Sequence, residues 1–172
     1  MIIQADTRQK KKHHDAKEKY FKEQGIEVIH SKMLVGDYCI PGKGDICVDT
    51  KANITELYGN LIQDHARFHN EAVLSQKAGI KLIILIENKD GIKCVDDVRL
   101  WKNPRYFYYF KEKKKAINNG TKEPKPPASN IQLIKIMHSM TRDYGVQFLF
   151  CTPEEAGAKV IELLKGEYDG RL

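Results

Sequence analysis

The sequence has no apolar run long enough to cross a bilayer, because its longest, residues 82–86, would span only a short strand. Its first residues also lack the apolar stretch of a secretory signal, since the lysines at 10–12 are followed by polar residues. No C-x-x-C pair occurs, which argues against a zinc or disulfide framework. The four cysteines lie far apart, at Cys39, Cys47, Cys94 and Cys151. We therefore expect one globular domain, residues 1–172, that resides in the cytoplasm and binds no membrane.

Positive charge is concentrated in two segments of a chain whose net charge is +6. Residues 8–19 carry Arg8, Lys10, Lys11, Lys12, Lys17 and Lys19. Residues 102–125 carry eight basic residues, among them Lys113, Lys114 and Lys115, against only two glutamates. Such clusters favour a polyanionic partner through counterion release, although a solvated surface would look the same.

Strand and helix patterns alternate along most of the chain. The expected strands cover residues 2–5, 26–29, 33–40, 45–51, 80–86 and 146–151. The expected helices cover residues 13–24, 53–78 and 130–144, and a last one starts at Thr152. Residues 41–44, Pro-Gly-Lys-Gly, predict a hairpin between two of the strands. The pattern predicts an α/β fold with a mixed central sheet and helices on both faces.

Residues 89–128 interrupt this rhythm with a basic and aromatic segment. It contains Trp101 and the aromatic run 106–110, then lysines, an Asn-Asn-Gly turn and a proline-rich stretch. We expect its first part to be helical and its second part to be a loop. The aromatic side chains suit stacking on unpaired bases, with the lysines on the backbone. Core packing or a partner interface would use the same residues.

Three residues suit phosphodiester hydrolysis: Asp37, Asp49 and Lys51. Asp49 and Lys51 are two apart, so on a strand they project from the same face. Hard cations such as Mg²⁺ prefer oxygen ligands, and an ammonium beside them can orient water or stabilise the transition state. D-x-K spacing occurs by chance in many chains, so the spacing does not distinguish a site from ordinary polar residues.

The hairpin register decides whether Asp37 can join the other two. A four-residue loop at 41–44 would set Asp37 against Val48, on the face opposite Asp49. A three-residue loop at 42–44, with Gly44 left-handed, would set Asp37 across from Asp49. A bulge at Gly36 would have the same effect. A catalytic site requires the register that brings the carboxylates together.

One further pair, His65 and His69, is four residues apart on a predicted helix. The spacing would allow the two imidazoles to hold a transition metal, but the glutamate of H-E-x-x-H is missing. We expect instead that the two histidines lie on a polar face of the helix, near DNA or solvent.

The motifs together resemble the nuclease domain of the XPF family, which includes the XPF, Mus and archaeal Hef proteins. Leu34-Val35-Gly36-Asp37-Tyr38 followed by Val48-Asp49-Thr50-Lys51 resembles the family's G-D-Y followed by E-R-K. Further similarity lies in Ala5-Asp6-Thr7-Arg8, in Arg67-Phe68, in Leu85-Ile86-Glu87, and in residues 130–164 with Pro153-Glu154-Glu155. The family belongs to the restriction-endonuclease-like PD-(D/E)XK superfamily, whose fold the resemblance implies for this chain.

The resemblance implies a metal-dependent DNA endonuclease that cuts branched, flap or junction DNA in repair or recombination, in a compact bacterial or phage form. It implies a Mg²⁺ site, which Mn²⁺ would also fill, at Asp37, Asp49 and Asp6, with Lys51 beside it. Arg8 and Arg67 would contact phosphate. A homodimer or a partner subunit is expected, in the bacterial cytoplasm or nucleoid or in a phage-infected cell. The alternatives are a catalytically silent DNA-binding or scaffold subunit, and a resolvase or restriction-type enzyme of the same superfamily.

The chain also departs from the family pattern. Asp49 replaces the usual glutamate, Thr50 replaces the arginine of E-R-K, and Gln9 replaces the acidic residue after Arg8. Glu71 matches a family glutamine only loosely, and Glu87 could be structural. Residues 89–128 look like an insertion into the nuclease domain. These departures put the fine positioning of the site and its DNA preference in question.

Overall fold

The computed structural model describes residues 1–8 and 14–167, and it is built on one six-stranded sheet. The strands lie in the order β2-β1-β3-β4-β5-β6. All run parallel except β3, which is antiparallel to both of its neighbours. They are β1 (Ile2–Asp6), β2 (Glu27–Ser31), β3 (Tyr38–Cys39), β4 (Ile46–Lys51), β5 (Lys81–Glu87) and β6 (Gln147–Cys151). The predicted mixed sheet is confirmed.

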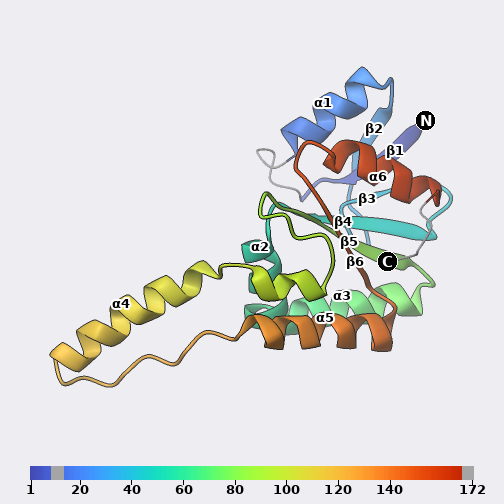
Figure 1. Cartoon of the computed structure of the whole chain (residues 1–172). Helices are drawn as coiled ribbons and strands as arrows, with labels where there is room; N and C mark the ends of the chain where they lie inside the picture. Colours follow the sequence, from blue (N-terminus) through green and yellow to red (C-terminus); the bar gives the residue numbers. More distant parts are fainter. Residues whose placement is uncertain (9–13, 168–172) are drawn as a thin grey trace.

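Helices cover both faces of this sheet, as predicted. The helical elements are α1 (Asp15–Glu23), α2 (Ile54–Tyr58), η2 (Gly59–Gln63), α3 (His65–Lys77), η3 (Asp96–Leu100), α4 (Pro104–Asn118), α5 (Asn130–Tyr144) and α6 (Ala156–Lys165). Figure 1 shows α1 and α6 together on one side of the sheet and α3 and α5 together on the other. None of the helices in the described part of the chain is long and apolar enough to cross a membrane.

Strand β5 explains why residues 82–86 are apolar without interruption. Leu82, Ile84 and Ile86 pack into the core beneath α3 and α5, whereas Ile83 and Leu85 pack into the core beneath α1 and α6. All five are at most 2% exposed. At about 1.5–3 kcal/mol for each buried side chain, this strand is a main source of stability for both layers.

The hairpin between β3 and β4 has the register that a three-residue loop predicts. Tyr38 lies opposite Val48 and Cys39 opposite Cys47, and beyond this pairing the Asp37 backbone N–H donates to the Val48 carbonyl. Gly44 has the expected left-handed backbone, with φ +61°. The register is therefore the one that the sequence required for a shared site, and the Asp37 carboxylate is near enough to raise the pKa of Asp49.

The predicted strand 33–40 is wrong in length, because only Tyr38–Cys39 form a strand. The chain turns at Gly36, whose φ is +68°. Asp37 resumes the contact with β4, and its backbone N–H donates to the Val48 carbonyl at 2.9 Å. A left-handed residue cannot continue a strand, so the extended pairing begins only after it.

The long helix predicted over residues 53–78 is also interrupted. Its start is as expected: Asn53 Oδ1 accepts from the Glu56 backbone N–H, and Glu56 Oε2 accepts from the Ala52 N–H. The helix then widens into the π-helical turn η2, where the Asp64 N–H donates to the Gly59 carbonyl. Gly59 is a weak helix former, and the wider turn separates α2 from α3.

The remaining helices follow their sequence signals closely. Ser129 and Gln132 exchange the two hydrogen bonds of a capping box, and α5 covers the predicted residues 130–144. Thr152 and Glu155 also bond reciprocally, but the regular turns of α6 begin only at Ala156. Of residues 89–128, the first part is helical in η3 and α4, and the region 121–128 contains no helix or strand.

We expect Gly36→Ala to destabilise the protein more than Gly42→Ala does. Both residues have positive φ, which costs alanine about 1–2 kcal/mol. A Cβ at Gly36 would also lie 3.1 Å from Cys47 Cβ and 3.3 Å from the Val48 carbonyl oxygen, whereas one at Gly42 would meet nothing within 4 Å. We expect a loss of about 1 kcal/mol at Gly42 and about 2–3 kcal/mol at Gly36.

Urea unfolding, followed by the fluorescence of the single tryptophan, Trp101, measures both losses. Equal losses in the two variants would show that the close approach at Gly36 does not constrain the hairpin.

Candidate active site

Two carboxylates and a lysine meet where β3 and β4 pair. Asp49 and Lys51 are both only 7% exposed, and Lys51 Nζ lies 2.5 Å from Asp49 Oδ2. Asp37 Oδ2 accepts two hydrogen bonds of 2.8 Å, from the backbone N–H and the hydroxyl of Thr50. The structure thus brings together the three residues that the sequence singled out, and it adds Thr50 as the residue that fixes the Asp37 carboxylate.

The burial of these groups shifts their proton affinities. Burial raises the pKa of Asp49 to about 6; the nearby Asp37 carboxylate adds to the shift and the Lys51 ammonium opposes it. Burial likewise raises the pKa of Asp37, against the opposing effects of Thr50 and Lys51. For Lys51, burial alone would lower the pKa, but the adjacent Asp49 carboxylate more than offsets this and the pKa is raised. Lys51 therefore stays protonated at neutral pH.

Glu71 of α3 is a third acidic residue in this group. Its Oε1 accepts a 2.9 Å hydrogen bond from the Gly36 N–H. Burial raises its pKa and the Asp49 carboxylate adds to the shift, while the Arg67 guanidinium opposes it. The sequence left Glu71 uncertain. Its spacing of four from Arg67 was the available signal, because residues four apart lie on one face of a helix.

Asp6 is placed differently from the other acidic residues. Its carboxylate accepts from the Arg8 guanidinium, at 2.5–3.1 Å, from the Arg8 backbone N–H at 2.7 Å and from the Met33 N–H at 3.1 Å. Burial alone would raise the pKa of Asp6, but these hydrogen bonds outweigh it and the pKa is lowered. Both oxygens are thus already engaged, chiefly in holding Arg8.

Arg8 links Asp6 to the other carboxylates. Its guanidinium also donates to the Met33 carbonyl at 2.9 Å, yet its side chain stays 59% exposed. The Asp6 hydrogen bond raises the pKa of Arg8, and the charges of Glu71 and Asp37 act in the same direction. Arg8 is therefore a fixed cation at the margin of the acidic group and remains accessible to a ligand.

The other basic residues that the sequence proposed for DNA contact lie in different surroundings. Arg67 is exposed on α3. Lys113 pairs with Glu123 at 3.0 Å and Lys115 with Glu112 at 2.8 Å. Lys114 is exposed and forms no ion pair with any residue that the structure describes. The lysines 10–12 of the first basic cluster lie outside the described residues.

Each histidine of the pair has its own protein partner, and the two ring centroids lie 6.1 Å apart. His65 Nδ1 lies 3.1 Å from the Leu61 carbonyl oxygen, and His69 Nε2 lies 2.7 Å from the Tyr144 hydroxyl. Within residues 1–8 and 14–167, no three His, Cys, Asp or Glu side chains are close enough to form a preassembled metal cluster. The four cysteines are unpaired.

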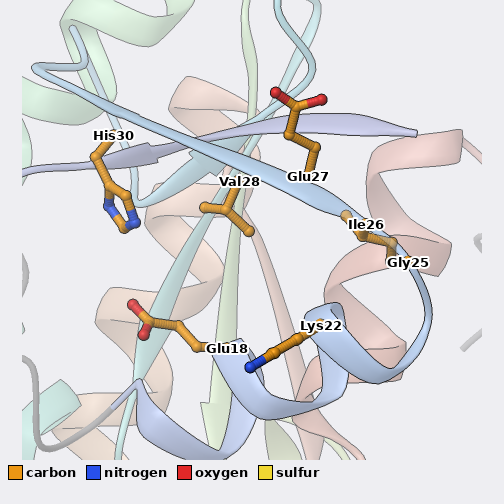
Figure 2. A pocket seen from close by; sticks show the side chains of 7 residues that line it. All are labelled: Glu18, Lys22, Gly25, Ile26, Glu27, Val28 and His30. Atoms are coloured by element: carbon orange, nitrogen blue, oxygen red, sulfur yellow. The ribbon is translucent and has the colours of Figure 1, made fainter.

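Two further features lie apart from this site. Glu87, buried at the end of β5, forms an ion pair with Lys17 of α1 on the opposite face of the sheet, which supports a structural role. An open hollow between α1 and β2 is lined by Glu18 and Lys22 on one side and by Val28 and His30 on the other (Figure 2). The hollow contains none of the proposed catalytic residues.

Comparisons with known proteins agree with this fold. Among solved structures, the chain is similar to XPF from Aeropyrum pernix, with a TM-score of 0.62 and 14% identity over 97% of this chain and 65% of that one. It is also similar to XPF from Aeropyrum pernix in complex with DNA, with a TM-score of 0.60 and 15% identity over 99% of this chain and 66% of that one. This chain thus spans less than two thirds of the length of those chains.

A comparison with curated protein sequences finds no match. The model of one protein family, the ERCC4 domain, matches residues 5–164. This match includes every residue that we assign to the candidate site, from Asp6 to Glu71, and the fold agrees with it. The predicted resemblance to an XPF-type nuclease domain is confirmed: the chain belongs to the ERCC4 domain family.

Proposed function

We propose that this protein is a metal-dependent endonuclease that cuts branched or partly single-stranded DNA. The observation that supports the proposal is the group of Asp37, Asp49 and Lys51, in which Asp49 and Lys51 are buried and the Asp37 carboxylate raises the pKa of both. Membership of the ERCC4 domain family supports a nuclease domain that acts on DNA. Metal dependence, the branched substrate, a role in repair or recombination and a dimeric state belong to the proposal.

The donor set fits Mg²⁺ or Mn²⁺. Asp37 and Asp49 offer oxygen ligands, and Mg²⁺ is commonly bound by one or two carboxylates together with substrate phosphates and water, so a cluster of three is not required. Asp49 Oδ2 is buried and accepts no hydrogen bond of ordinary geometry from a described residue, although Lys51 Nζ is near. A bound cation would supply Lewis acidity and a lowered pKa for a water molecule.

The protein residues have separate tasks in this proposal. Thr50 fixes the orientation of Asp37 through two hydrogen bonds. Lys51, which stays protonated, donates to the attacking water or to the phosphate as charge develops there. Asp6 holds Arg8, and we assign it this positioning role rather than that of a metal ligand. Arg8 and Arg67 neutralise phosphates beside the scissile bond.

Asp49→Asn and Lys51→Met should each reduce cleavage at least about 100-fold, the usual scale for losing one transition-state contact. The assay compares flap, fork, Holliday-junction and linear DNA, with Mg²⁺, with Mn²⁺ and with chelator. Asp45→Asn is the matched control, because Asp45 is an exposed aspartate beside the same strand. We expect cleavage by the control to match the unsubstituted protein.

Full activity in both site variants would refute the assignment. If the unsubstituted protein binds DNA and cuts none of the four substrates, the silent DNA-binding subunit is the correct alternative. Equal cleavage of linear and branched DNA would favour a restriction-type enzyme.

Asp6→Asn tests whether Asp6 positions Arg8 or binds metal. A carboxylate whose folded pKa is lowered stabilises the protein above its unfolded pKa of about 3.9, and this stabilisation is lost as the pH falls through the folded pKa. We expect the variant to be about 1–2 kcal/mol less stable at pH 7, a figure kept low because Arg8 is largely exposed. The deficit should shrink by pH 3. Urea unfolding across this pH range measures it.

A Mn²⁺ titration gives the second measurement for Asp6. In the positioning role, Asp6→Asn changes Mn²⁺ affinity less than about two-fold, whereas Asp49→Asn lowers it by about the 10- to 100-fold known for groups at a metal site. If Asp6→Asn lowers the Mn²⁺ affinity as much as Asp49→Asn does, Asp6 is a metal ligand.

A further inference from the structure

The aromatic and basic segment forms an arm that stands away from the sheet and its helices. The arm, residues 104–127, consists of α4 and the extended region that runs back beside it (Figure 1). Tyr106 donates a hydrogen bond to the Pro127 carbonyl, and the Lys113–Glu123 ion pair joins the two halves. These contacts give the arm a defined inner side, against its own returning chain, and an opposite outer side.

The root of the arm is attached to the helix that follows the proposed catalytic strand. Tyr58, the last residue of α2, packs against Trp101 with ring centroids 5.9 Å apart. The Arg105 guanidinium lies 5.1 Å from the centre of the Tyr58 ring, and the Tyr58 hydroxyl donates to the Ala128 carbonyl at 3.1 Å. One side chain of α2 thus contacts both ends of the arm, so the arm is anchored close to β4 in the chain.

The outer side of α4 carries two aromatic side chains followed by two basic ones. Phe107, Phe110, Lys111 and Lys114 have the i, i+3, i+4, i+7 spacing of a single helix face, which we name the outer stripe. Phe107 is 70% exposed and Phe110 61% exposed. The Phe110 ring contacts Tyr106 and Tyr109, at centroid distances of 6.1 and 5.2 Å, and these contacts support it as a fixed platform.

The lysines of the arm differ in whether an acidic side chain neutralises them. Lys113, on the inner side, is paired with Glu123, and Lys115 is paired with Glu112. Lys114 of the outer stripe has no ion-pair partner among the described residues. The outer stripe therefore combines exposed rings with positive charge that acid side chains do not neutralise fully.

We propose that the outer stripe binds the unpaired DNA strand of a branched substrate, with bases stacked on Phe107 and Phe110 and phosphates against Lys111 and Lys114. This inference deepens the proposed function and rests on it for the identity of the substrate. Single-stranded nucleic acid is recognised by aromatic platforms within a basic surface. A second copy of the chain fits less well, since it would bring a surface of the same positive charge against the stripe, whereas phosphate is of opposite charge.

The length of the stripe sets the size of its ligand. From Phe107 to Lys114 the helix rises by about 10 Å at 1.5 Å per residue. At about 3.4 Å per nucleotide of a stacked strand, this accommodates about three nucleotides. A short unpaired arm at a fork or flap is therefore sufficient.

The test measures binding in chelator, so that it does not depend on cleavage. The probes are a labelled fork with two non-complementary arms and a blunt duplex of equal length, followed by fluorescence anisotropy. We expect the unsubstituted protein to bind the fork more tightly. Phe107→Leu with Phe110→Leu, which keeps apolar helix formers but removes the rings, should lower fork affinity about ten-fold and duplex affinity less than two-fold. Phe107→Tyr with Phe110→Tyr should retain fork affinity.

The two neighbouring lysines give a matched electrostatic comparison. Lys114→Ala should reduce the slope of log affinity against log salt on the fork by about 0.7, the value for one phosphate contact to a single strand. The neutralised Lys113 is the control, and Lys113→Ala should leave the slope unchanged.

Several outcomes would overturn the proposal. If the double leucine variant keeps its fork affinity, bases do not stack on Phe107 and Phe110. If the salt-dependence slopes of Lys113→Ala and Lys114→Ala are equal, Lys114 does not contact a phosphate. If sedimentation shows a dimer that only the leucine variant dissociates, with fork affinity intact, the stripe is a contact between two copies. Fork binding that follows the expected pattern, without Mg²⁺-dependent cleavage, refutes the proposed nuclease function alone.

Discussion

At Gly36 the chain leaves the extended conformation and passes so close to β4 that a Cβ there would lie 3.1 Å from Cys47 Cβ. The same residue donates its N–H to Glu71 of α3, and the next N–H, that of Asp37, donates to β4. A left-handed glycine thus ties a helix and a strand to one short segment of backbone. The position of Asp37 beside Asp49 and Lys51 depends on this tie. Without it, a strand only two residues long would have little to hold its register.

The site gathers more buried negative charge than positive charge. Burial raises the pKa of Asp37, Asp49 and Glu71, and the buried Lys51 is the cation that opposes the shift at all three. Such a group costs folding free energy, because charges are desolvated and like charges approach each other. The site lies on β4, next to β5, and the buried side chains of β5 stabilise both faces of the sheet and offset this cost. A cation bound by the carboxylates would relieve the same repulsion, so the charge arrangement that costs folding free energy would favour cation binding.

Much of this fold follows from local sequence rules. The capping residues of α5, the continuous apolar run of β5 and the glycine-containing hairpin each predicted the correct element, because each depends on interactions within a few residues. The short β3, the π-helical turn at η2 and the projecting arm did not follow from such rules. In these elements the backbone is set by contacts with distant segments, such as Gly36 with Glu71 or Tyr58 with Ala128.

The site shows the same division between local and distant contacts. Spacing of two on a strand was enough to put Asp49 and Lys51 together. Glu71 and Thr50 were missed as partners, since their contacts join residues far apart in the sequence or on neighbouring strands. The carboxylate of Asp6 illustrates the limit of motif reasoning: the motif identifies a residue near the site, but only the donors around its oxygens show that it holds Arg8.

Thr50 gives a physical account of one departure from the motif that the sequence resembles. Where that motif has arginine, this chain has a hydroxyl that donates to Asp37 Oδ2, in parallel with the Thr50 backbone N–H. Two donors to one oxygen fix the orientation of the Asp37 carboxylate. An arginine could not supply this short bond from Cβ, and its charge would be carried farther from the strand. In this chain Arg8, which Asp6 of β1 holds, supplies an exposed cation near the site. Threonine at position 50 and the Asp6–Arg8 pair can therefore be understood together, as a division of tasks between fixing the carboxylate and presenting positive charge to phosphate.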